Sequence, residues 1–209
     1  MAAASRYGLA VPTARGAADA NTGPQRIAWF QRLLGLCDGK TLVDLGAGHG
    51  KFSIVAADLG WQVTAIDARG DRYPEDPRIT WQVGDVREAP VADFDVVACL
   101  GLFYHLTVDD QIDLLARCAG RPIILDTHVA NDAKSQFTLS DEVTLRGYRG
   151  KLYVEGDQAV HSTASWGNDE SFWPRTRALY RMLNDHGFEV LTASPWYLPS
   201  RTFFLCLPR

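Results

Sequence analysis

Several features are scarce in this sequence of 209 residues, and each narrows what the protein can be. The four cysteines form no C-x-x-C pair, and each lies in or beside an apolar segment, which is typical of reduced, buried thiols. No stretch approaches the ~18 apolar residues that a membrane span needs, and the N-terminal segment lacks the apolar core of a signal peptide. These features predict a cytoplasmic protein without a membrane anchor.

Positive charge is not in excess either. Lys and Arg number 21 against 25 Asp and Glu, and the formal net charge of -4 opposes the positive field of a dedicated nucleic-acid binder. We therefore expect a small-molecule partner in preference to a nucleic acid, and a homodimer stays open. Apolar residues make up 46% of the chain, which suffices for one domain whose core needs neither a disulfide nor a metal.

Apolar strands and helical segments alternate along most of the chain. Strands are expected in TLVDL, WQVTAID, ITWQVGDV, DFDVVACLGL and RPIILDTHV, and the last two, FEVLTAS and RTFFLCL, suit an antiparallel pair. Strands that are apolar throughout are typical of a parallel sheet covered on both faces. The pattern predicts a single Rossmann-like α/β domain with a seven-stranded, mostly parallel sheet, an antiparallel last strand and helices on both faces.

The remaining segments divide the chain. Residues 1–23 lack a clear period and are predicted to form a flexible arm or lid, while residues 24–209 form the domain. Within the domain, residues 130–173 are polar and rich in aromatics, which predicts a hairpin or irregular cap over a substrate pocket. A helix is expected from Trp173 to His186, before Gly187.

The most informative segment is VDLGAGHG, residues 43–50, where a strand runs into glycines at the start of a helix. Glycines allow a bound cofactor to approach the backbone closely. A dinucleotide fingerprint would carry a third glycine where Lys51 stands, so the motif argues against a nicotinamide oxidoreductase. Asp67 closes the second strand, where a carboxylate can accept both hydroxyls of a ribose, and Asp85 follows the third strand.

Through VDLGAGHG, VTAID, GDV and CLGLFYHL, the chain resembles the class I S-adenosylmethionine-dependent methyltransferases over roughly residues 24–207. The resemblance implies S-adenosylmethionine as cofactor. The glycines would line its methionine side, Asp67 would bind the ribose, and Asp85 and Val86 would meet the adenine. The implied cofactor residues are Asp44, Gly46, Gly48, Gly50, Asp67, Asp85, Val86, Leu100 and Gly101.

A second, more local similarity concerns LGLFYHL and the later FWPRTRALYRMLNDHGFEV, which look like segments of tRNA wobble-uridine carboxymethyl transferases and their small-molecule relatives. Basic residues would be expected after Tyr104-His105 for a carboxylated cofactor, but Leu106 and Thr107 stand there. This similarity supports the fold and the cofactor more than a substrate. A tRNA-modifying methyl or carboxymethyl transferase remains the alternative function.

Four side chains near the ends of the fourth and fifth strands are candidates for catalysis. Asp126 and His128 share one strand face and could remove a proton from an acceptor, although capping and packing explain both equally simply. Tyr104 could attract the sulfonium through its ring face, and His105 could position the acceptor, although both could be packing residues. No metal is predicted, because Asp126 and His128 alone are too few ligands.

The sequence thus predicts a methyltransferase that methylates an oxygen, a hydroxyl on a small molecule such as a saccharide or secondary metabolite. Methyl transfer is an in-line displacement, so holding the two reactants in line does much of the work. A cofactor-binding module without catalysis is the third alternative, beside the tRNA-modifying enzyme and the oxidoreductase.

Overall fold

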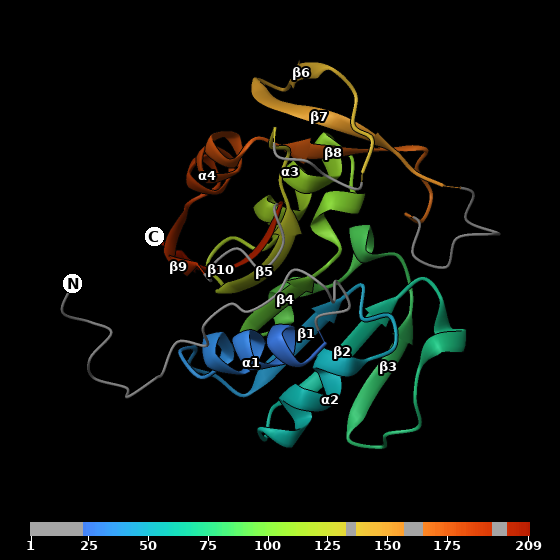
Figure 1. The fold of residues 1–209 in the computed structure, drawn as a ribbon. Coiled ribbons are helices and arrows are strands. Elements are labelled where there is room, and N and C mark those ends of the chain that lie inside the picture. Colours follow the sequence, from blue (N-terminus) through green and yellow to red (C-terminus); the bar gives the residue numbers. More distant parts are fainter. Residues whose placement is uncertain (1–22, 133–136, 157–164, 194–199) are drawn as a thin grey trace.

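A sheet of seven strands forms the centre of the molecule (Figure 1). The structure is a computed structural model that describes residues 23–132, 137–156, 165–193 and 200–209. The strands are β1 (Thr41–Leu45), β2 (Gln62–Asp67), β3 (Ile79–Val83), β4 (Val96–Leu100), β5 (Ile123–His128), β9 (Phe188–Ala193) and β10 (Arg201–Pro208). Their order is β3-β2-β1-β4-β5-β10-β9, and β10 runs antiparallel to both of its neighbours. The predicted α/β class and mostly parallel sheet are confirmed.

The order of the strands determines where a ligand can bind. The chain moves outward from β1 to β2 and β3, then returns to pair β4 with the other side of β1. In open parallel sheets, the crevice at such a reversal, beyond the carboxyl ends of the strands, is the usual ligand site. The glycine motif follows β1 directly, so it lies at this crevice.

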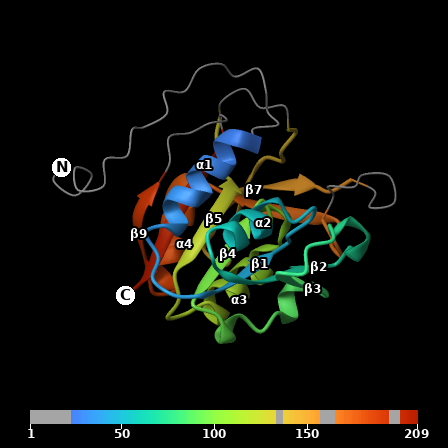
Figure 2. The ribbon, with the colours of Figure 1, turned by 90° about the horizontal axis from the view of Figure 1, so that it is seen from below.

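Helices cover both faces of the sheet (Figure 2). On one face lie α1 (Gly23–Leu34) and α2 (Lys51–Asp58), and on the other lie α3 (Val108–Arg117) and α4 (Thr176–Asp185). Strand β4 serves both layers: its first, third and fifth residues pack with Phe30 of α1, whereas Val97 and Cys99 pack with Leu114 of α3. Burial on both faces explains why the central strands are apolar at every position.

The predicted cap is more regular than the sequence suggested. It contains a three-stranded antiparallel sheet, β6 (Glu142–Leu145), β7 (Tyr148–Val154) and β8 (Glu170–Pro174), at the top of Figure 1. The prediction that a helix begins at Trp173 is wrong, because Trp173 and Pro174 complete β8 and α4 begins at Thr176. Pro174 lacks a backbone N–H, so it suits the end of an edge strand.

The predicted N-terminal arm lies almost wholly outside the described residues. Of the predicted arm, only Gly23 is described, and it begins α1; residues 1–22 lie outside the described part of the chain. Among the described residues, no helix is both long and apolar enough to cross a membrane.

Candidate functional site

The glycine turn between β1 and α2 has two different sides. Gly48 has φ 55°, and a Cβ built there would meet nothing within 4 Å, so the turn is open at this position. Gly50 has φ 66°, and its Cβ would lie 2.3 Å from the Trp81 ring. The side of Gly50 where a Cβ would project is therefore filled by Trp81, and its predicted place at the methionine side stays a prediction. At Gly46, a Cβ would approach the Leu102 side chain to 3.1 Å.

Two buried aspartates, Asp67 and Asp44, stabilise the glycine turn and the helix that follows it. The Asp67 carboxylate, at the end of β2, accepts the Gly48 N–H through Oδ2 and the Arg69 N–H through Oδ1, both at 2.9 Å. Asp44 accepts the Ser53 hydroxyl at 2.6 Å and so ties β1 to the first turns of α2. Burial raises the pKa of Asp44 to about 7, despite the Ser53 hydrogen bond. Asp67 therefore fixes the turn, whereas Asp44 fixes the helix behind it.

A cavity of about 70 Å³ opens beside the turn, between the main sheet and the cap. Its lining residues come from the ends of four strands, β1 to β4, and from the cap: Gly46, Asp67, Ala68, Arg69, Asp85, Val86, Arg87, Leu102, His105, Leu106, Ser165 and Trp166. Trp166 is half exposed, the Arg69 guanidinium lies 5.4 Å from its ring centroid, and Arg87 donates to its carbonyl oxygen at 3.3 Å. Two arginines thus hold the tryptophan of the cap at the cavity.

Asp85 is engaged by one of these arginines. Arg87 donates to both carboxylate oxygens, at 2.9 Å from Nε and 2.6 Å from Nη2, and holds the pKa of Asp85 below its usual range. The backbone N–H of Arg87 also donates to Asp85, which therefore caps the short helix η3 (Val86–Glu88). An adenine amino group at Asp85 would have to share these oxygens with Arg87.

The donor set of the cavity fits the nucleoside part of S-adenosylmethionine. Asp67 presents a carboxylate beside an open glycine turn, which suits vicinal hydroxyls, and Val86 and Leu102 supply apolar walls. The volume is smaller than the ~300–1,000 Å³ of typical ligand pockets. The lining residues fit the group.

At the carboxyl end of β5, Asp126 is fully buried and joins two arginines. Arg26 of α1 donates to Oδ2 at 2.9 Å from Nε, and Arg201 of β10 donates to both oxygens at 2.8–3.0 Å. A Cβ at Gly101 would lie 2.7 Å from Arg201 Nη2 and 3.3 Å from Arg26 Nη2, so both arginines border the end of β4. Asp126 was predicted as a proton acceptor, but the structure shows its carboxylate committed to this arginine pair.

His128 lies on the same strand face as Asp126, as predicted, but it is 2% exposed. Its Nδ1 is 2.7 Å from the Ser200 hydroxyl, and its ring stacks on Trp173 with centroids 4.7 Å apart. Burial, with a contribution from the Arg201 charge, lowers the pKa of His128 to about 3. His128 is therefore a neutral, packed ring that binds protons weakly.

Tyr104 and His105 belong to the short helix η5 (Phe103–His105) after β4, and their environments differ. The Tyr104 ring packs against His128 and Trp173, and the Arg201 guanidinium lies 5.2 Å from its centroid. A cation of the protein thus already lies at the ring predicted to attract the sulfonium. His105 lines the cavity beside the glycine turn, and its Nδ1 is 2.9 Å from Glu155 Oε1.

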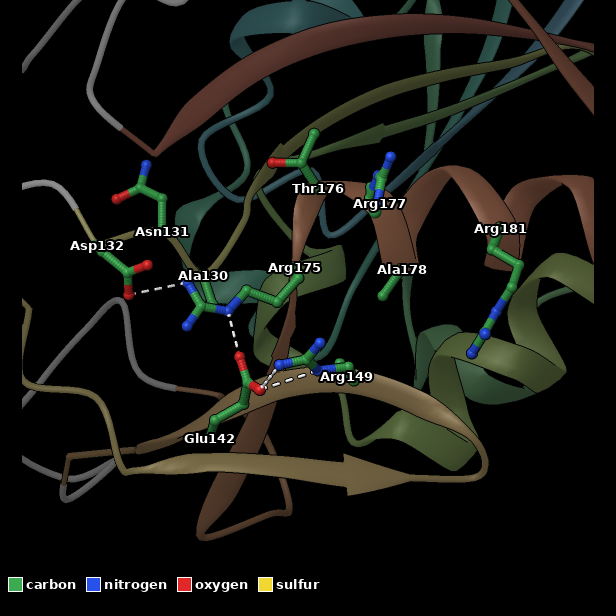
Figure 3. Close-up of a pocket in the computed structure, with 10 residues that line it drawn as sticks. All are labelled: Ala130, Asn131, Asp132, Glu142, Arg149, Arg175, Thr176, Arg177, Ala178 and Arg181. Atoms are coloured by element: carbon green, nitrogen blue, oxygen red, sulfur yellow. Dashed lines mark hydrogen bonds and ion pairs between the residues drawn. The ribbon is translucent and has the colours of Figure 1, made fainter.

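A larger cavity, about 790 Å³, lies between α4, the cap and the residues that follow β5. Figure 3 shows Glu142 between Arg149 and Arg175, and Asp132 at the other side of Arg175. These pairs tie the cap sheet to the start of α4. None of the residues predicted to bind the cofactor lines this cavity, so we assign it no part in the cofactor site.

Sequence reasoning missed Arg26, Arg201, Arg87 and Glu155. Arg26, Arg201 and Glu155 meet their partners only through the fold; Arg26 and Asp126, for example, lie 100 positions apart. Arg87 lies only two residues after Asp85, so a local signal for this pair was present in the sequence. His161 of the predicted cap lies outside the described residues. Among the described residues, no three His, Cys, Asp or Glu side chains are grouped closely enough to hold a metal ion.

Comparison with known proteins agrees with this geometry. A family model described as a methyltransferase domain matches residues 42–121, which run from β1 to the start of β5. Ubiquinone biosynthesis O-methyltransferases of Bordetella pertussis and Aromatoleum aromaticum are each 30% identical over 107 residues, covering 46% of this chain and 44% of the relative. The chain thus spans less than half the length of these curated relatives.

Solved structures resemble almost the whole chain. The N-terminal domain of EvdMO1 with S-adenosylhomocysteine bound has a TM-score of 0.63 at 20% identity, covering 91% of this chain and 82% of that one. A Burkholderia thailandensis 1,6-didemethyltoxoflavin-N1-methyltransferase has a TM-score of 0.59 at 16% identity, covering 91% and 79%. At such identities the likeness concerns the fold. The methyltransferase family model over residues 42–121 and the shared fold agree with the resemblance to the class I S-adenosylmethionine-dependent methyltransferases.

Proposed function

We propose that this protein transfers a methyl group from S-adenosylmethionine to a hydroxyl of a small molecule, such as a saccharide or a secondary metabolite. The observation that carries the proposal is the open turn at Gly48, whose N–H is held by Asp67 at the edge of a cavity between sheet and cap. The O-methyltransferase relatives favour oxygen as the methylated atom. One solved neighbour is the EvdMO1 domain in the presence of D-fucose, and another is an N-methyltransferase. The neighbours thus do not agree on one acceptor, and the hydroxyl acceptor named here is proposed.

Calorimetry with S-adenosylhomocysteine tests the cofactor directly. We expect saturable binding with one site per chain and no binding of NADH, because the glycine motif lacks the dinucleotide spacing. Binding of NADH without S-adenosylhomocysteine would overturn the proposal. A chain that binds S-adenosylhomocysteine but methylates no acceptor would be a binding module instead.

Salt dependence separates a small-molecule acceptor from tRNA. Affinity for RNA falls steeply with salt because phosphate contacts release counterions. The net charge of -4 leads us to expect no salt-dependent retention of tRNA at low ionic strength. Tight retention that disappears at high salt would instead favour the tRNA-modifying alternative.

A further inference from the structure

His105 and Glu155 join the main domain to the cap beside the candidate cofactor cavity. His105 ends η5, and Glu155 follows β7 and is 9% exposed. Besides the contact with His105, Glu155 Oε1 accepts the Ser171 hydroxyl at 2.7 Å, and Oε2 accepts the Ser165 N–H at 3.0 Å. A buried carboxylate with three donors holds its position, and so does a ring bound to it.

This contact selects one form of the imidazole. Burial alone raises the pKa of Glu155, but the hydrogen bonds from His105, Ser171 and Ser165 outweigh burial and hold the pKa below its usual range. Glu155 is therefore a carboxylate at neutral pH and can only accept, so Nδ1 of His105 must donate. A neutral ring with its proton on Nδ1 carries its lone pair on Nε2.

Nε2 is the nitrogen that remains available. Within the described residues it has no hydrogen-bond partner, the side chain is 18% exposed, and His105 lines the cavity that contains Asp67 and Asp85. The titratable or charged groups around His105 are Glu155, Tyr104 and His128, with Arg69 and Arg87 across the cavity. A cavity-lining imidazole whose Nδ1 is held by a carboxylate and whose Nε2 has no partner among the described residues suits a general base.

The other predicted bases lack these properties. His128 has a low affinity for protons, and its Nδ1 is hydrogen-bonded to Ser200. The Asp126 carboxylate accepts hydrogen bonds from Arg26 and Arg201. Neither lines the cavity at the glycine turn. Among the four residues predicted for catalysis, His105 is the one that combines a place in the cavity lining with a ring nitrogen, Nε2, that has no partner among the described residues.

We infer that His105 is the general base of the methyl transfer and that Glu155 is its positioning residue; the inference rests on the proposed function. The acceptor oxygen bonds to the methyl carbon as the carbon–sulfur bond breaks and leaves its electron pair on sulfur. The hydroxyl proton passes to Nε2. Positive charge thus moves from the sulfonium to the imidazolium, which the Glu155 carboxylate stabilises.

Nitrogen-15 NMR of the histidine rings tests the orientation without any acceptor. In the full-length protein we expect His105 to carry its proton on Nδ1 at neutral pH, and saturating S-adenosylhomocysteine to shift its Nε2 resonance. Glu155→Gln should convert the single tautomer into a mixture. Glu170→Gln, the same change at an exposed neighbour in β8, should leave it intact. A wild-type ring protonated on Nε2 would overturn the inference. An Nε2 resonance that does not shift when S-adenosylhomocysteine binds would overturn it as well.

Turnover provides the second test, with methyl-labelled S-adenosylmethionine and a panel of phenols and sugars as probe acceptors. On the best acceptor, His105→Asn should lower kcat by about 10²–10⁴-fold, the usual contribution of a general base. Glu155→Gln should lower kcat with little change in KM, because the His105 ring is no longer held in one orientation. His128→Asn should lower kcat much less.

The controls distinguish failure of this inference from failure of the proposed function. S-adenosylhomocysteine affinity should stay within about twofold in Glu155→Gln, since hydrogen bonding of His105 changes and the nucleoside contacts do not. An equal fall in affinity and in kcat would show that the pair merely fastens the cap, and would refute the role of His105. Lack of S-adenosylhomocysteine binding by the wild type would instead refute the proposed function.

Discussion

The two halves of the carboxyl edge of the sheet are built differently. At the ends of β1, β2 and β3, the residues belong to short strand-to-loop motifs, and Asp67 meets Gly48 only 19 positions away. At the ends of β4 and β5, the partners are distant: His105 pairs with Glu155 across 50 positions, and Asp126 with Arg26 across 100. Following the proposed function, we call the β1–β3 edge the cofactor half and the β4–β5 edge the acceptor half. The first is encoded locally, whereas the second depends on the assembled fold.

The largest effect that would test this contrast is expected at Asp126. In Asp126→Asn the two partly buried arginines lose their shared anion, and breaking such a pair costs about 3–5 kcal/mol of unfolding free energy. Urea denaturation measures the loss. Asp109→Asn, which breaks an exposed pair with Arg146, is the matched control and should change stability little. Equal effects of the two variants would show that the arginine pair does not hold the acceptor half together.

The glycine turn sharpens the comparison within the cofactor half. Gly50→Ala forces a methyl group onto Trp81 and strains a positive φ, so we expect a loss of roughly 2–5 kcal/mol in unfolding free energy. Gly48→Ala meets no atom, so only the strain of about 1–2 kcal/mol remains. Thermal unfolding should rank the two variants in this order.

Binding should separate the same two glycines in a second way. The Gly48 methyl would project into the open side of the turn, so Gly48→Ala should weaken S-adenosylhomocysteine binding by more than its stability loss suggests. If Gly48→Ala binds as tightly as the wild type, the nucleoside does not approach the turn there.

Asp67→Ala should have the next largest effect, on affinity. It removes the acceptor expected for the ribose hydroxyls and releases the Gly48 N–H, and hydrogen bonds to charged groups contribute about 1.5–3 kcal/mol, or roughly 10- to 100-fold. Calorimetry with S-adenosylhomocysteine measures this loss. Asp71→Ala, at the next acidic position in the chain, controls for charge and should bind normally. Wild-type affinity in Asp67→Ala would remove the carboxylate from the nucleoside site.

The same contrast explains what could be predicted from the sequence. The sheet, its order of elements and the positions of Asp67 and Asp85 follow from apolar periodicity and from spacing, which are local properties. The environment of His128 does not. Its two-residue spacing from Asp126 correctly predicts a shared face, but not the Ser200 hydroxyl or the Trp173 ring that bury it, which arrive from strands far along the chain. Likewise, nothing near Glu155 in sequence indicates that it faces His105.

The smallest effect concerns pH and also belongs to the acceptor half. Folding lowers the pKa of His128 from an ordinary 6.5 to about 3. Below pH 6.5 the unfolded chain therefore binds a proton at His128 that the folded protein does not bind. Stability is therefore complete above that value and falls as the pH drops toward 3. Between about pH 7 and about pH 5 the loss amounts to at most about 2 kcal/mol.

Replacing the ring tests this dependence. His128→Asn should be less stable than the wild type near neutral pH, because it loses stacking on Trp173, but the gap should narrow in urea titrations as the pH falls. A constant gap would mean that His128 takes up a proton in the folded protein. His128, at the end of β5, would then again be a candidate general base beside His105 of η5.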